Sequence, residues 1–130
     1  MLRGPMAASD IPKPVRQLIV RHIDSVQQVE ILDLLRRDPE RSWTAELISR
    51  KLRIAGASCA EWLDRFATDG LIEGDHVGYR DAPNGRHATA VHELLDLYGR
   101  RRTTVIEAIY SRPSDSIQSF SDAFRLRRDD

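Results

Sequence analysis

The stretch CAEWLDRFATDGLIEGDHVGYR, residues 59–80, constrains the fold of this chain more than any other segment. Three of its apolar residues recur at the spacing of one helix face: Cys59, Leu63 and Phe66. The pattern predicts a helix over 57–69 that turns those three side chains toward the core.

The residues after this helix predict a cap and a hairpin. Gly70 stands where a left-handed helix cap is expected, because glycine has no Cβ to oppose that conformation. Residues 71–73 are typical of a short strand and residues 77–80 of its return. We therefore expect the turn of the hairpin at residues 74–76.

Two further helices precede this unit. Ser25 and Gln28 form a capping-box pattern at the start of a helix over 26–37, whose apolar residues recur at helical spacing. Thr44 can cap a second helix that runs from residue 45 to about residue 52. The chain thus predicts three helices and then a hairpin.

The N-terminal residues 1–22 contain Gly4, Pro5, Pro12 and Pro14, which disfavour regular structure. We predict a loose N-terminal arm, in which residues 15–20 start a short helical turn that docks onto the body.

The C-terminal residues predict more helix. A long helix is expected over 88–101, and its spacing continues to Tyr110 after a kink near Gly99. A last short helix is expected beyond Pro113, with Ile117, Phe120 and Phe124 on its apolar face.

The order helix, helix, glycine-containing turn, helix, Gly-Leu-Ile and hairpin resembles the winged helix-turn-helix family. The residues that carry this resemblance are WTAELISRKLRIAGASCAEWLDRFATDGLIEGDHVGYR, 43–80, and with the first helix it covers about residues 25–80. It implies a mainly α fold with a small two-stranded antiparallel wing. The winged-helix core would span 23–82, and a C-terminal helical extension 83–130. The flanking segments HIDSVQQVEILDLLRRDPERSW and SFSDAFRLRRDD resemble small bacterial proteins with no assigned activity.

The resemblance implies a DNA-binding transcriptional regulator whose third helix enters the major groove of double-stranded DNA. On this hypothesis the contacts come from the end of the second helix, the third helix and the wing: Arg50, Lys51, Arg53, Ser58, Glu61, Arg65 and Arg80. Phosphate contacts come largely from lysine and arginine. Among the side chains that the third helix exposes, however, only Arg65 is a cation, while Glu61 and Asp64 are anions.

This acidic helix favours a second function, a winged-helix protein-protein interaction module that does not bind DNA. The chain has 20 basic and 20 acidic residues, so it has no general attraction to polyanions. Trp62 lies beside the apolar stripe, and with Glu61 and Asp64 it would contact a protein partner. The alternative is that Trp62 packs against the wing or the long C-terminal helix.

The long C-terminal helix has more apolar residues than one small core needs. We expect them to mediate homodimerisation, as the helix after the wing does in many winged-helix proteins, through Leu94, Leu95, Tyr98, Val105, Ile106 and Ile109. The alternative is that this helix folds back on the helix over 26–37 and completes the core of a monomer.

No motif of an enzyme or of a metal site occurs in the sequence. Cys59, the one cysteine, excludes an intramolecular disulfide, and the four histidines show no metal-binding spacing. We therefore expect a protein without catalytic activity, metal or cofactor. No run of about 18 apolar residues could cross a membrane. Since the N-terminus also lacks the apolar core of a secretory signal, we expect a cytoplasmic location.

Overall fold

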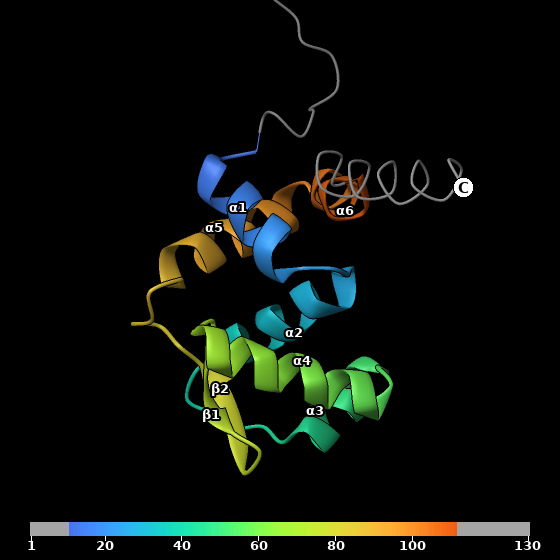
Figure 1. Ribbon diagram of the computed structural model, residues 1–130, viewed down its shortest axis with the longest axis vertical. Helices are drawn as coiled ribbons and strands as arrows, with labels where there is room; N and C mark the ends of the chain where they lie inside the picture. Colours follow the sequence, from blue (N-terminus) through green and yellow to red (C-terminus); the bar gives the residue numbers. More distant parts are fainter. Residues whose placement is uncertain (1–10, 112–130) are drawn as a thin grey trace, which may run out of the picture.

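The computed structural model describes residues 11–111 of the 130-residue chain (Figure 1). This range contains six helices and one antiparallel two-stranded sheet. The elements are, in order, α1 (Lys13–His22), α2 (Val26–Arg37), α3 (Ala45–Leu52), α4 (Gly56–Asp69), β1 (Ile72–Asp75), β2 (Gly78–Asp81), α5 (Ala88–Arg100) and α6 (Arg102–Ser111). A mainly α fold with a small antiparallel hairpin is therefore confirmed.

The elements form two groups that α2 joins. Helices α1, α5 and α6 lie together at one end of the molecule, whereas α3, α4 and the hairpin lie at the other (Figure 1). Helix α2 contacts α3 and β2 on one side and α5 on the other. The buried side chains of both groups belong to a single core cluster.

Local capping explains where the central helices begin and end. The Gln28 side chain accepts from the backbone N–H of Ser25 at 2.9 Å, which fixes the first turn of α2. Thr44 Oγ1 accepts from the Leu47 N–H at 3.2 Å and caps α3. Helix α4 ends at Gly70, which is left-handed with φ 86°. The three helices begin and end within about one residue of their predicted bounds.

The hairpin differs from the prediction in the position of its turn. Gly74, expected in the turn, pairs with Tyr79 within the ladder, and the reversal lies at His76 and Val77. Gly74 has φ 110°, and a Cβ at this position would collide with the carbonyl oxygen of Gly78. This glycine thus permits a close backbone approach inside a strand, a role that its sequence position does not distinguish from a turn.

The segment before α3 adds to the hairpin. The Trp43 N–H donates to the Tyr79 carbonyl at 2.8 Å, and the Tyr79 N–H donates back to the Trp43 carbonyl at 2.7 Å. Both aromatic side chains are buried. The hairpin is therefore held to the body by backbone bonds as well as by packing.

Helix α1 is more than the short docking turn expected in a loose arm. It has ten residues, and Val15, Leu18 and Ile19 are buried in the core. It packs against α5 and α6. The described part of the predicted arm is thus a structural element of the fold.

The C-terminal helices also differ from their predicted role. The helix is interrupted at Arg101, between α5 and α6, two residues after the predicted kink. Of the six residues expected to mediate dimerisation, five are buried within the chain itself: Leu94, Leu95, Tyr98, Val105 and Ile109. Ile106 is half-buried against the same core. The five buried residues complete the chain's own core, because α5 packs on α1 and α2 and α6 packs on α1 and α5, so these five offer no surface to a second copy.

The last predicted helix, with Ile117, Phe120 and Phe124, lies outside the described residues. No helix among residues 11–111 has the length and apolar character needed to cross a lipid bilayer.

Candidate interaction surface of α4 and the hairpin

Helix α4 turns its apolar face inward, as predicted. Cys59, Leu63 and Phe66 have 0% exposure. Burial raises the pKa of the Cys59 thiol to about 11, and its Sγ lies 3.6 Å from the carbonyl oxygen of Ala45. A thiol with so high a pKa is protonated at neutral pH and is a poor nucleophile. Cys59 thus serves as a small core residue.

The opposite face of α4 is exposed and predominantly acidic. Glu61, Asp64 and Arg65 are exposed, together with Ala60 and Thr68. The face therefore presents two carboxylates and one guanidinium among small side chains.

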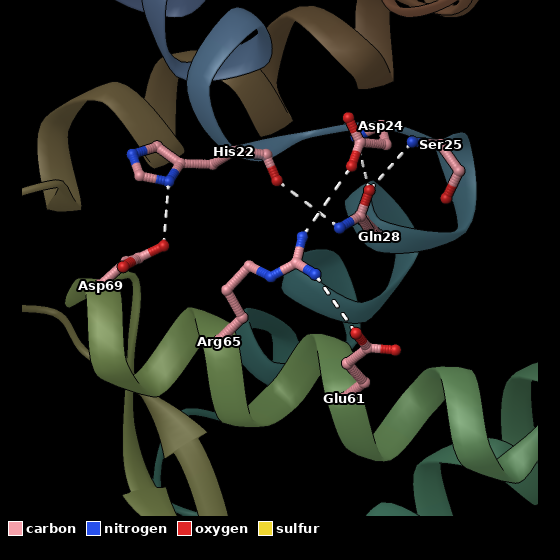
Figure 2. A network of polar contacts seen from close by, with 7 residues as sticks. All are labelled: His22, Asp24, Ser25, Gln28, Glu61, Arg65 and Asp69. Atoms are coloured by element: carbon pink, nitrogen blue, oxygen red, sulfur yellow. Dashed lines mark hydrogen bonds and ion pairs between the residues drawn. The ribbon is translucent and has the colours of Figure 1, made fainter.

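The guanidinium of Arg65 is already engaged within the chain. Its Nη2 lies 3.5 Å from Glu61, one turn earlier on α4, and its Nη1 lies 3.9 Å from Asp24 between α1 and α2. Figure 2 shows Arg65 pointing from α4 toward this α1–α2 connection. Because two carboxylates neutralise it, Arg65 adds little positive potential to the surface.

The hairpin continues the acidic surface. Glu73 and Arg80 lie opposite each other in the ladder and form an ion pair at 3.5 Å. Asp75 accepts from the Val77 N–H at 2.9 Å and so shapes the turn. From residue 56 to residue 81 the chain carries six carboxylates and only two arginines, both of them ion-paired. We call this region, α4 and the hairpin, the acidic surface.

The end of α3 differs from the acidic surface in charge. Arg50 forms an ion pair with Glu46 at 2.8 Å. Lys51 and Arg53 are exposed and form no ion pair with a carboxylate of residues 11–111. The residues named for DNA contacts therefore divide into three groups: ion-paired Arg50, Arg65 and Arg80; unpaired Lys51 and Arg53; and the uncharged or acidic Ser58 and Glu61 of α4.

Trp62 lies at the edge of the acidic surface. It is half-buried and packs against the core, while Glu61 and Asp64 beside it are exposed. Its ring is thus largely covered by its own chain, and a part of it is left for contact from outside. Ser58, also half-buried, lies one turn before it.

A junction of two histidines and an aspartate lies at the C-terminal end of α4. The His22 Nδ1 lies 3.3 Å from Asp69 Oδ2, and Figure 2 shows this contact between the end of α1 and the end of α4. The rings of His22 and His87 are 5.1 Å apart, edge to face. Sequence spacing could not reveal this junction, because His22, Asp69 and His87 come from three distant segments.

The described residues contain no group of three His, Cys, Asp or Glu side chains arranged to hold a metal ion. Comparisons of the chain with protein-family models, with curated proteins and with solved structures gave no match.

Proposed function

We propose that α2 to β2 form a winged helix-turn-helix unit. The order of the elements supports this proposal, as does the short turn of residues 53–55 between α3 and α4. The backbone bridge between Trp43 and Tyr79 supports it too, because it adds a third extended segment to the wing.

We propose that this winged helix is a non-enzymatic interaction module that binds a protein partner rather than DNA. The observation that carries the proposal is the charge of the acidic surface, with six carboxylates and two ion-paired arginines. A helix that enters the major groove needs unpaired cations to offset the phosphates, and here the carboxylates would repel them. A partner with lysine and arginine at its contact surface is complementary instead.

Within this surface, Asp64 and Trp62 have the clearest roles. Asp64 is exposed and has no ion pair within residues 11–111, so its charge is available to a partner. Trp62 supplies apolar area at the edge of the same face. Aromatic side chains of this kind dominate the energetics of many protein interfaces.

DNA binding is the second candidate, and one observation favours it. Lys51 and Arg53, at the end of α3, are cations without a carboxylate partner among residues 11–111. Contacts from the end of this helix to a phosphate backbone need no base recognition by α4.

A salt-titrated binding assay with mixed genomic DNA fragments separates the two functions. We expect no saturable binding, even at low salt. Binding that weakens linearly on a log–log plot, with a slope of several units, would contradict the proposal. In that case Lys51→Gln with Arg53→Asn should reduce the slope by about two units, since each phosphate contact contributes about one.

Co-purification from the native host tests the partner directly. We expect a protein that is retained by the wild type and lost by Asp64→Lys. Glu107→Lys makes the same charge change at an exposed position of α6, outside the acidic surface, and this variant should retain the partner. Equal recovery with Asp64→Lys and Glu107→Lys would exclude the acidic surface as the binding site.

A further inference from the structure

A cavity of about 280 Å³ lies where α2, the end of α3 and the α5–α6 junction meet. It is separate from the acidic surface, because its walls contain no residue of α4 or the hairpin. Its charged lining comes from three parts of the chain: Glu30, Asp33 and Arg37 of α2, Lys51 and Arg53 at the end of α3, and Arg102 at the start of α6.

The charges of this lining leave a positive excess, with four cations and two carboxylates. Both carboxylates already have partners. Asp33 accepts from Arg37 at 2.5 Å, and Glu30 accepts from the Tyr98 hydroxyl at 3.5 Å. Neither carboxylate forms an ion pair with Lys51 or Arg53, and once the Arg37–Asp33 pair is set aside the lining keeps three cations against the one charge of Glu30.

One arginine of the lining has an unusual backbone conformation, and another stacks on an aromatic ring. Arg53 is the residue that ends α3, with φ 58°, and no other non-glycine residue in 11–111 has a positive φ. Glycine or asparagine is the usual residue at such a position, so an arginine here keeps an unfavourable backbone together with its long cationic side chain. The guanidinium of Arg102 lies 4.7 Å from the centroid of the Tyr98 ring and stacks over it.

We propose that this cavity binds a small phosphorylated metabolite, with its phosphate between Lys51 and Arg53. Arginine and lysine form short, charge-assisted hydrogen bonds with phosphate oxygens. Two cations that have no ion-pair partner provide the positive charge that such an anion requires. The volume of about 280 Å³ lies just below the usual range for ligand pockets, about 300–1,000 Å³, which favours a compact metabolite over a dinucleotide. This proposal does not depend on the function of the acidic surface.

Phosphate binding should stabilise the whole fold, because the cavity is built from both groups of elements that α2 joins. The thermal midpoint of the full-length protein is the measurement. Inorganic phosphate is the probe, titrated against sodium chloride at constant ionic strength. We expect a saturable rise of the midpoint, and about tenfold weaker binding for Lys51→Gln with Arg53→Asn. Asparagine tolerates the left-handed backbone of position 53, so this variant should remain folded.

A matched control removes the same number of cations elsewhere. Lys13→Gln with Arg16→Gln changes the exposed face of α1 and should leave phosphate binding unchanged. The absence of a saturable rise would overturn the proposal, as would an equal loss in both double variants. A third outcome would also overturn the proposal: a short DNA duplex binds through Lys51 and Arg53, and inorganic phosphate does not compete with it. These cations would then belong to a nucleic-acid surface.

Discussion

The surroundings of His87 shift the pKa of its imidazole, a group that titrates near neutral pH. Burial lowers the pKa of His87, and the positive charges of His22 and Arg86 lower it further. Asp69 acts in the opposite direction, but its effect is smaller. Arg86 also donates to the Asp69 carbonyl at 3.1 Å, which ties the loop before α5 to the end of α4. The folded protein therefore favours neutral His87.

This shift makes the stability of the fold depend on pH. At a pH well above about 6.5, the ordinary pKa of histidine, the residue is neutral in both the folded and the unfolded chain, and its contribution is fully present. As the pH falls below this value, the unfolded chain binds a proton that folded His87 resists, so the free energy of unfolding decreases. Equilibrium urea unfolding between about pH 7 and pH 5 measures this decrease, which should be smaller for His87→Gln.

The control for this prediction is His76→Gln. His76 is exposed in the turn of the hairpin, and its replacement should leave the pH dependence of the wild type in place. A pH dependence that His87→Gln does not reduce would show that other groups cause it.

At the scale of the element, the start of α2 depends on one side chain. Gln28 has 0% exposure, and its Oε1 accepts from the backbone N–H groups of Asp24, at 2.5 Å, and Ser25, at 2.9 Å. Its Nε2 lies 3.5 Å from the carbonyl oxygen of His22. One amide thus joins the end of α1 to the first turn of α2, as Figure 2 shows.

Gln28→Ala should destabilise the protein by about 1–3 kcal/mol, the usual cost of leaving buried polar groups without a partner. Gln27→Ala, at the preceding position of the same helix, should change the free energy of unfolding by no more than about 0.5 kcal/mol. Urea unfolding of both variants gives the comparison. Similar values for the two would mean that the Gln28 bonds contribute nothing beyond ordinary helix packing.

The boundaries of α2, α3 and α4 could be predicted because their signals are local. Ser25 and Gln28, Thr44, and Gly70 each act within a few residues of the helix end that they set. The turn of the hairpin could not be predicted in the same way. Glycine is a common turn residue, so the sequence places Gly74 in the turn. Its structural role depends instead on how close the backbone of Gly78 comes across the ladder.

At the scale of the whole molecule, the spacing of residues along the chain does not predict which distant segments pack together. An apolar stripe indicates that a helix needs cover, but it does not identify what covers it. The stripe of α5 predicts a cover by either a second copy of the chain or the helix over 26–37, and in the structure α1 and α2 cover it. The charges of the α4 face could be predicted from its periodicity. The ion pair of Arg65 with Asp24 and the cavity beside Lys51 depend on the packing of separate helices, which spacing along the chain does not show.

The packing of α1 can be tested with two neighbouring residues of that helix. Ile19 has 1% exposure within the core, and Val20 has 38% exposure on the outer face. If α1 is part of the core, Ile19→Ala should cost about 2–5 kcal/mol, as large-to-small changes in cores do. Val20→Ala should stay within about 0.5 kcal/mol, because it removes little buried area. A loose arm would instead make both changes nearly neutral in urea unfolding, so the difference between these two variants measures how far the fold depends on its N-terminal helix.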